Sequence, residues 1–343
     1  MELPTVTGWR ECWGPCPGER APASGWVGTR VRSWSSGRGE RRWSWGVAAS
    51  DSHGWRRAHV VQRLLSPDTL AIPSMPQPLG HIAPDSLAAL VGIIFDIDDT
   101  ITRHGRLEAE AFDAIHRLAE AGLKLIAVTG RPLGWSDVAA HLWPIDLAVG
   151  ENGAGWAWRT GPALSHGYYE EREARARGQE LLARVRDRVS AEMPEVQTAG
   201  DQYLRRCDLA YDVGETVTLE AGAIDQLLRI IEDAGARSTV SSVHAHAVPG
   251  EWDKARGVVR AARGVLDIDL DGERDRWLFI GDSGNDAAAF AHFPVSVGVR
   301  NVEAHLDRIP RPPTYITQAD RGLGFQEMAN LVLGNRAPPP PRS

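Results

Sequence analysis

Apolar residues form two alternating patterns along the chain from about residue 90 onward. Short continuous apolar runs are typical of strands buried on both faces of a parallel sheet, and they alternate here with segments of helical periodicity. The predicted strands are 91–95, 123–128, 146–149, 277–280, 295–299 and 314–317. The predicted helices are 107–121, 134–142, 255–263, 285–292 and 323–333. This alternation predicts an α/β fold built on a doubly wound parallel sheet with right-handed crossovers.

A segment of different character, roughly residues 154–250, interrupts this alternation. Its predicted elements are a long amphipathic helix at about 170–191, strand-like runs at 203–213 and 238–248, and a helix at about 220–234. Such a mixture is typical of a small α+β unit with its own core. We therefore predict an inserted α+β domain at 154–250, flanked by a sheet domain formed by 76–153 and 251–334.

The first 75 residues have another composition again. They are rich in Trp, Arg, Gly and Ser, contain no Lys, and show almost no periodic apolar pattern. Such a segment cannot bury enough apolar surface to offset its chain entropy. We therefore expect residues 1–75 to be disordered or not part of the functional protein, with Met75 as the alternative start. The proline-rich residues 335–343 are expected to form a solvated tail.

Composition narrows the classes of function. The formal net charge of −7 argues against nucleic-acid binding and against attraction to an anionic membrane. No apolar run approaches the roughly 18 residues that span a bilayer, and no signal peptide is evident. The three cysteines, Cys12, Cys16 and Cys207, are odd in number and thinly spread, which argues against a disulfide scaffold. These features predict a cytoplasmic protein that binds neither nucleic acid nor membrane.

Polar residues that carry chemistry follow the predicted strands. Asp96, Asp98 and Asp99 come directly after the first strand, where ligands bind in open parallel sheets. Three carboxylates within four residues repel one another, so they need a proton or a cation. Oxygen ligands of this kind suit Mg²⁺. The alternative is a solvated acidic turn without a ligand.

Three further short stretches lie at comparable positions. Thr129-Gly130 ends the second strand, where a hydroxyl and backbone N–H groups can hold phosphate oxygens. Lys254 opens the helix that follows the insert, and Asp282 and Asp286 frame a Gly-rich turn after the strand at 277–280. The first two stretches alone are weak signals, and the third is moderately specific. Together, at strand ends and helix starts, they predict a single site at one edge of the sheet.

This set of stretches resembles the four motifs of the haloacid dehalogenase (HAD) superfamily of phosphohydrolases. The motifs are similar to Asp96-Ile-Asp98-Asp99-Thr100, Thr129, Lys254 and Gly281-Asp282-Ser-Gly-Asn285-Asp286, and the resemblance covers about residues 90–333. Asp99 stands where many members have Gly. The position of the insert and the sequences Thr129-Gly-Arg and Glu151-Asn-Gly resemble the branch with a type IIB cap, the Cof-like and sugar-phosphate phosphatases.

The resemblance implies a Rossmann-like core with a cap domain and a role for each motif. It implies Asp96 as nucleophile, Asp98 as general acid and base, and an Mg²⁺ ion held by Asp96, Asp282 and the backbone carbonyl of Asp98. Phosphate would be held by Thr129, Gly130 and Lys254, with support from Asn285 and Asp286. Arg131 and Asn152 are the candidates for contact with the rest of the substrate.

The expected function is hydrolysis of a small phosphorylated metabolite, with a sugar phosphate as the best candidate. Two alternatives stay open: a phosphomutase on the same scaffold, and a non-catalytic protein whose cap binds a ligand. A transition-metal site at His244 and His246, two residues apart on a predicted strand, is a weaker possibility because no third ligand is evident.

Overall fold

The computed structural model describes residues 29–33, 44–48 and 75–336 of the chain, which divides into a unit before residue 72 and a second unit from there on. In the first unit, β1 (Thr29–Ser33) pairs antiparallel with β2 (Ser44–Ala48). The other residues of the segment 1–75, except Met75, lie outside the described part. So does the tail from residue 337, and the expectations for both segments stay expectations.

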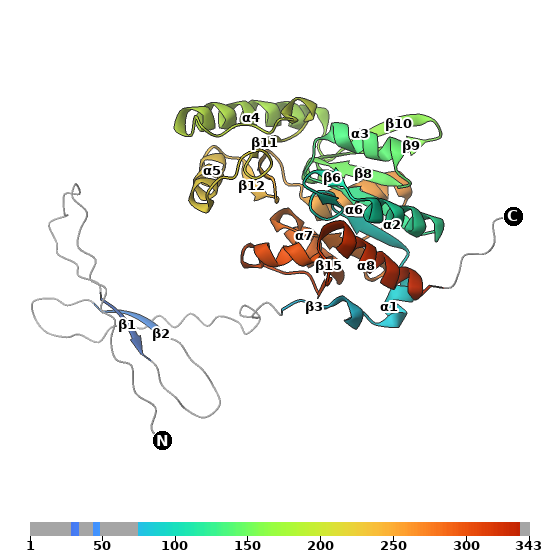
Figure 1. Ribbon diagram of the computed structural model, residues 1–343. Coiled ribbons are helices and arrows are strands. Elements are labelled where there is room, and N and C mark those ends of the chain that lie inside the picture. The colour runs from blue at the N-terminus through green and yellow to red at the C-terminus, as the bar shows by residue number, and fades with distance from the viewer. Residues whose placement is uncertain (1–28, 34–43, 49–74, 337–343) are drawn as a thin grey trace, which may run out of the picture. The chain divides into compact units, whose positions relative to one another are not determined.

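The second unit is built around one nine-stranded sheet (Figure 1). Its strands, in spatial order, are β10 (Ala163–Tyr168), β9 (Gly155–Thr160), β8 (Leu147–Gly150), β7 (Lys124–Val128), β4 (Gly92–Phe95), β14 (Trp277–Gly281), β15 (Val295–Gly298), β16 (Tyr315–Ile316) and β3 (Gln77–Pro78). All neighbouring pairs from β8 to β3 are parallel. The predicted doubly wound parallel sheet is therefore confirmed.

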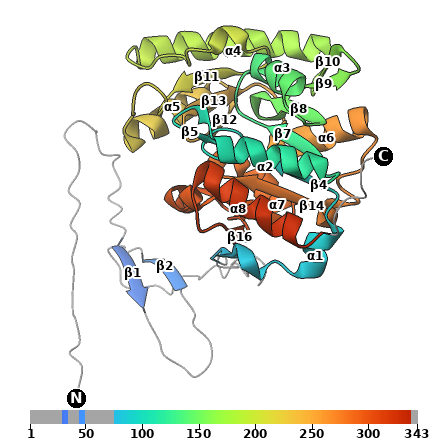
Figure 2. The same cartoon turned by 45° about the vertical axis from the view of Figure 1, so that its right-hand side comes forward.

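Helices cover both faces of this sheet because successive strand residues point to opposite sides. Ile93 and Phe95 of β4 pack with α1 (Pro84–Ala89), α2 (Ala109–Glu120) and α8 (Arg321–Gly334). Ile94 lies on the other face, towards α6 (Lys254–Leu266) and α7 (Ala287–His292). Figure 2 shows α2 and α8 side by side in front of the sheet. All four residues of β4 are buried, which explains the continuous apolar run in the sequence.

The strands that follow β4 in the sequence are added first on one side of β4 and later on the other, so the strand order reverses between β4 and β14. From β4 the chain moves outward through β7 and β8, and it later returns to the other side of β4 through β14, β15 and β16. In open α/β sheets, the crevice beyond the carboxyl ends of the strands at such a reversal is where ligands bind. The fold therefore places a binding crevice at the ends of β4 and β14.

The inserted unit is smaller than the sequence predicted. We expected it to begin at residue 154, but β9 and β10 extend the large sheet antiparallel, with Trp156 opposite Val149. The reversal occurs in the 3-10 turn Glu151–Gly153, where Asn152 and Gly153 have φ of 55° and 107°. The separate unit thus begins after Tyr168. We call this unit, from 169 to 250, the cap.

The cap has its own three-stranded antiparallel sheet and apolar core. Its elements are α4 (Arg172–Glu192), β11 (Leu209–Asp212), α5 (Ala221–Asp233), β12 (Arg237–Val240) and β13 (His244–Val248), with β13 central. The strand-like run at 203–213 is a 3-10 turn at Gln202–Leu204 followed by β11, and the run at 238–248 is the hairpin of β12 and β13. Leu182, Val185 and Val189 of α4 face this core, as the helical spacing predicted.

The remaining elements are short. β5 (Thr102–Arg103) and β6 (Arg106–Leu107) form a hairpin after β4, and α3 (Leu133–Leu142) follows β7. Further 3-10 turns are Leu79–His81, Arg274–Arg276, Gly284–Asp286 and Arg300–Arg308. The hairpin matters for the site because it lies directly beyond the acidic turn that ends β4.

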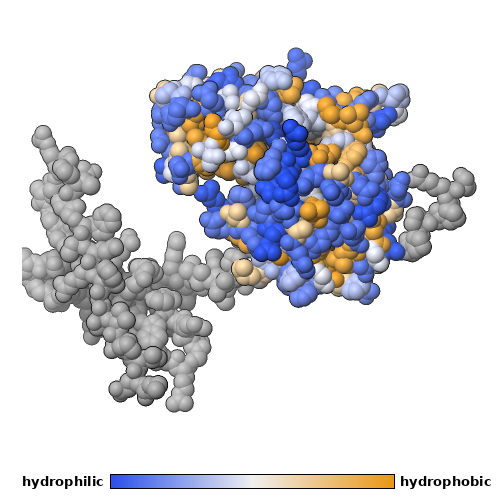
Figure 3. All heavy atoms as spheres, in the orientation of Figure 1, coloured by the Kyte–Doolittle hydropathy of each residue, from blue (hydrophilic) through white to orange (hydrophobic). Residues whose placement is uncertain are grey.

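The face of the second unit that Figure 3 shows is largely hydrophilic, with separate apolar patches. Trp135, Val138 and Leu142 on α3 are among the unit's exposed large apolar side chains. Their spacing of three and four residues places these three side chains on one face of the helix. Within the described residues, no helix combines the length and apolar content that a bilayer crossing requires.

Candidate active site

Three carboxylates meet at the carboxyl ends of β4 and β14. Phe95 pairs with Ile280, so Asp96 and Asp282 leave the two neighbouring strands almost level with each other. Asp286 comes from the 3-10 turn Gly284–Asp286. One carboxylate oxygen from each of these three residues lies within 4.8 Å of the others, and all three residues are buried. The structure therefore brings the first and fourth sequence motifs together at one place.

Lys254 reaches this cluster from the start of α6. Its Nζ donates hydrogen bonds to Asp96 Oδ1 at 2.6 Å and to Asp286 Oδ1 at 2.7 Å, and its side chain is fully buried. The preceding residue, Asp253, caps the helix by accepting from the N–H of Arg256. Gly153 and Gly257 allow the start of α6 to approach the end of β8 closely, because a Cβ on either glycine would overlap the other chain segment.

Burial and mutual repulsion dominate the electrostatics of the cluster. Burial raises the pKa of Asp96 to about 7, with Lys254 opposing the shift and Asp286 and Asp98 adding to it. Burial, Asp96 and Asp286 also raise the pKa of Asp282 well above its ordinary value. Burial alone would lower the pKa of Lys254, but Asp286 and Asp96 outweigh burial and raise it. The ammonium is therefore charged, while the three carboxylates need more positive charge than it supplies.

A divalent cation fits this donor set. The cluster offers carboxylate oxygens only, which are the ligands that hard cations prefer. Asp282 Oδ1 is buried and has no hydrogen-bond partner, while Oδ2 accepts from Asn301 Nδ2 at 3.2 Å. A buried carboxylate oxygen without a donor is costly, so a cation would satisfy it. Asp96 and Asp282 are the side chains that could hold the ion, because both oxygens of Asp286 already accept hydrogen bonds, Oδ1 from Lys254 and Oδ2 from two backbone N–H groups.

Replacing Lys254 with methionine is expected to destabilise the metal-free protein by about 3–5 kcal/mol, because it leaves buried carboxylates without their counter-charge. Urea unfolding in the presence of EDTA measures this loss. Lys124→Met is the matched control: Lys124 is 51% exposed in its pair with Asp146, and its replacement is expected to cost less than about 1 kcal/mol. Equal losses in the two variants would contradict the pairing of Lys254 with Asp96 and Asp286.

The other two aspartates of the first motif point away from the cluster. Asp98 accepts from Arg131 Nε at 3.0 Å on both oxygens and from Arg131 Nη2 at 2.8 Å on Oδ1. Asp99 has φ of 52° and pairs with Arg321 Nε at 2.8 Å. The Asp98 side chain is therefore not part of the carboxylate cluster. Only its backbone carbonyl could serve as the metal ligand that the resemblance implied.

Thr129 and Gly130 form a tight turn at the end of β7. Thr129 is buried, and its Oγ1 accepts from the N–H of Arg131 at 3.0 Å. A Cβ on Gly130 would lie only 3.2–3.3 Å from polar atoms of His246, Asn152 and Asn285, so a side chain there would push against these three residues. We call residues 129–131 the phosphate turn, after the role proposed below.

Asn152 and Asn285 join the ends of β8 and β14. Asn285 Nδ2 donates to Asn152 Oδ1 at 2.9 Å, and Ser283 Oγ donates to Asn285 Oδ1 at 3.0 Å. Asp286 Oδ2 accepts from the N–H groups of Asp282 and Ser283, which closes a capping box. These contacts hold the fourth motif rigid. Asn152 Nδ2 is buried without a partner beside the phosphate turn.

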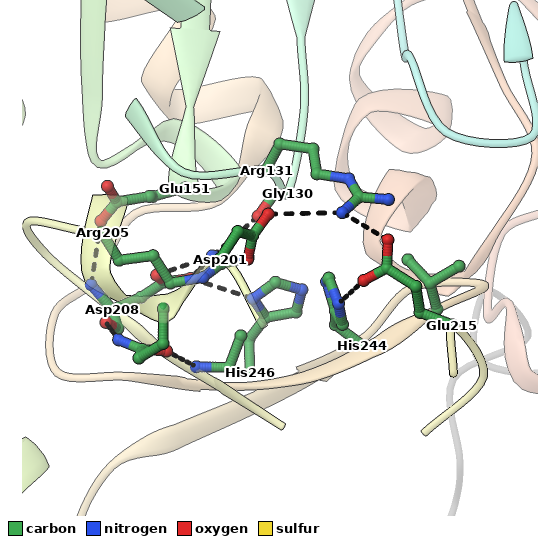
Figure 4. Close-up of polar contacts among 12 residues, drawn as sticks. Gly130, Arg131, Glu151, Asp201, Arg205, Asp208, Glu215, His244 and His246 are labelled. Atoms are coloured by element: carbon green, nitrogen blue, oxygen red, sulfur yellow. Dashed lines mark hydrogen bonds and ion pairs between the residues drawn. The ribbon is translucent and has the colours of Figure 1, made fainter. Parts of the chain in front are cut away.

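The cap contributes contacts that the sequence did not reveal (Figure 4). Glu151, fully buried at the end of β8, accepts from the N–H groups of Arg206, Cys207 and Asp208 in the cap. Burial, aided by Asp208, raises the pKa of Glu151 to about 7. Arg205 Nη1 donates to the carbonyl of Gly130 at 2.8 Å. No sequence signal marks these contacts, because they join residues more than fifty positions apart.

His244 and His246 each pair with a carboxylate. His244 Nε2 lies 2.8 Å from Glu215 Oε2, and His246 Nδ1 lies 2.9 Å from Asp208 Oδ2 (Figure 4). Burial lowers the pKa of His246 to about 4, so its ring is neutral near pH 7. The weaker possibility of a transition-metal site gains no third ligand here. Both histidines instead position acidic residues of the cap.

A cavity of about 300 Å³ opens between the core and the cap next to Asp98. Its walls include Asp98, Asp99, Arg131 and Arg321 of the core and Gly214 and Glu215 of the cap. The lining is mainly polar and charged. A volume of this size admits a small polar ligand, with one end at the phosphate turn and the other against the cap.

Residues 93–173 match the family model of haloacid dehalogenase-like hydrolases. The matched segment contains Asp96, Asp98 and Thr129, which belong to the first two of the four motifs, while Lys254 and Asp282 lie outside it. The fold and the placement of the four motifs agree with this match to haloacid dehalogenase-like hydrolases. The findings support an enzyme of the hydrolase class.

Solved structures add detail within this class. Protein 0175 of Thermoplasma acidophilum has a TM-score of 0.54 and 18% identity, covering 71% of this chain and 99% of its own. A HAD/Cof-like protein of Plasmodium vivax has a TM-score of 0.54 and 16% identity, and the match covers 73% of this chain and 98% of that protein. The sucrose-phosphatase of Synechocystis has a TM-score of 0.52 and 16% identity, and the match covers 70% of this chain and 97% of that protein. At these identities the structures show a common fold of core and cap. No curated protein matches the chain in sequence.

Proposed function

We propose that the protein is a Mg²⁺-dependent phosphatase that hydrolyses a phosphate monoester through an aspartyl-phosphate intermediate. The observation that carries this proposal is the placement of Asp96. Its carboxylate is buried at the topological switch point, 2.6 Å from the ammonium of Lys254 and within the carboxylate cluster suited to a cation. A carboxylate nucleophile in a site with this positive charge can approach a phosphate dianion.

The first step transfers the phosphoryl group to Asp96. Its oxygen forms a bond to phosphorus while the ester P–O bond breaks, and Asp98 gives its proton to the leaving oxygen. Asp98 then takes a proton from water, the resulting hydroxide attacks phosphorus, and Asp96 is released with inorganic phosphate. Thr129 Oγ1, the N–H of Gly130 and Lys254 Nζ would hold the phosphoryl oxygens.

Mg²⁺, when bound, offsets the negative charge of nucleophile and phosphate and stabilises the charge of the transition state. Asp96, Asp282 and the backbone carbonyl of Asp98 would hold the ion. Asp286 keeps Lys254 in place through its hydrogen bond and fixes the turn after β14. Asn285 supports the same turn through Asn152.

The proposed substrate is a small phosphorylated metabolite, with a sugar phosphate as the leading candidate. Two observations support this class: the polar cavity of about 300 Å³ beside Asp98, and the shared fold with a sucrose-phosphatase whose structure contains sucrose and phosphate. Arg131 lines the cavity and Asn152 has a free buried N–H group beside the phosphate turn. Both would contact the substrate beyond its phosphoryl group.

A panel of phosphorylated metabolites tests the proposal. With Mg²⁺, the protein is expected to release inorganic phosphate from one group of related esters, and EDTA should abolish the release. Formation of a positional isomer without free phosphate would identify a phosphomutase instead. Failure to turn over any ester, with ligand binding retained, would favour a non-catalytic binding protein.

A further inference from the structure

Arg131 connects the core to the cap through a single buried guanidinium. On one side it donates to Asp98 through Nε and Nη2. On the other side, Nη1 lies 2.8 Å from Glu215 Oε1 and 3.3 Å from Asp201 Oδ2, and both of these residues belong to the cap (Figure 4). The Arg131 side chain is only 5% exposed. One cation is thus shared by one carboxylate of the core and two of the cap.

Glu215 is itself held in place from the cap. Its second oxygen, Oε2, lies 2.8 Å from His244 Nε2 on the central cap strand β13. The hydrogen bond from His244 and the charge of Arg131 outweigh burial and lower the pKa of Glu215 to about 2. Glu215 is therefore a carboxylate at neutral pH with both oxygens in use. It forms the shorter of the two cap contacts to Arg131.

The planar guanidinium transmits this restraint to Asp98. Because its donors are fixed in one plane, holding Nη1 also sets the direction of Nε and Nη2. Asp98 Oδ1 accepts from both Nε and Nη2, whereas Oδ2 has only a share of the Nε hydrogen. Oδ2 is therefore the oxygen that remains available for proton exchange. Asp98, Arg131 and Glu215 all line the cavity beside the phosphate turn.

We infer that Glu215 is a positioning residue for proton transfer: from the cap it fixes Arg131, which aligns Asp98 with the leaving-group oxygen. The inference rests on the proposed function, because it concerns the step in which Asp98 protonates that oxygen as the ester P–O bond breaks. Its consequence is that Asp98 is fully aligned only while the cap lies over the core. The cap then takes part in the chemistry as well as in enclosing the substrate.

The leaving group provides the test. Phenyl phosphate and p-nitrophenyl phosphate share a ring, but p-nitrophenolate is a far weaker base than phenolate and leaves with little need for a proton. Glu215→Ala is expected to lower kcat/KM about tenfold for phenyl phosphate and less than about threefold for p-nitrophenyl phosphate. kcat/KM is the proper measure because it covers the steps up to phosphorylation of Asp96. Glu215→Gln, which keeps a neutral hydrogen bond, should fall between wild type and Glu215→Ala.

Glu192→Ala is the matched control. Glu192 also belongs to the cap, but it pairs with Arg188 in an exposed position on α4, and its replacement should leave both esters unaffected. Equal losses on the two esters would assign Glu215 a merely structural role, and no loss on either would remove it from the site. Either result overturns the inference alone. Failure of the wild-type protein to hydrolyse these two esters and every ester of the metabolite panel would overturn the proposed function instead.

Discussion

Phosphate release is expected to disappear when Asp96 is replaced with asparagine. The amide is a poor nucleophile, and it is also a weaker ligand for a cation than the carboxylate. Loss of a covalent nucleophile typically costs about 10⁶-fold in kcat. The measurement is phosphate release from the best ester of the panel at saturating substrate and Mg²⁺. Acid-quenched samples of the wild-type protein should carry a phosphoryl group that the variant lacks.

Asp85→Asn is the control for this experiment. Asp85 is exposed at the start of α1, so the same chemical change there should leave kcat within error of the wild-type value. Thermal unfolding of both variants establishes that they are folded. Full activity of Asp96→Asn would show that another group attacks phosphorus, and the assignment of the site would then be wrong.

Asp98→Asn is expected to lower kcat/KM for phenyl phosphate by about 10²–10⁴-fold, the usual loss for a general acid. For p-nitrophenyl phosphate the first step needs less help from a proton, whereas the attack of water on the aspartyl-phosphate still needs a base. The variant should therefore release one equivalent of p-nitrophenol in a rapid burst and then turn over slowly. Stopped-flow absorbance records the burst and the slow phase separately.

Asp99→Asn provides the comparison within the same turn. Asp99 pairs with Arg321 and faces away from the carboxylate cluster, so its variant should show neither the burst nor the dependence on the leaving group. A uniform loss of rate on both esters in Asp98→Asn would instead indicate a defect in binding or folding.

Much of the core could be predicted from the sequence because its signals are local. A parallel strand covered by helices on both faces must be apolar at every position, as β4 and β14 are, and such runs are visible without any knowledge of tertiary contacts. The polar residue that follows each run then marks the ligand edge of the sheet. Asp96 and Asp282 were identified in this way, and the structure places them together.

The cap boundary could not be predicted because pairing decides it. Residues 155–168 have the alternation of an antiparallel strand pair, which suits either the cap sheet or the edge of the core sheet. The left-handed conformation of Asn152 and Gly153 turns the chain back onto β8, so these residues extend the core. A sequence records the tendency to form a strand, but it does not record which edge the strand joins.

The sequence by itself determined the fold class and the residue types that converge at the ends of β4, β7 and β14. Burial and strand periodicity can be recognised from the pattern of apolar residues at neighbouring positions. Only the tertiary structure decided the partners of these residues. It turned Asp98 towards Arg131, which is 33 residues away in the sequence. It also brought Glu215, more than eighty residues after Arg131, to the same guanidinium. Ionic contacts between distant residues depend on how the strand ends of the core come together and on how the cap lies against the core, and no local pattern encodes either arrangement.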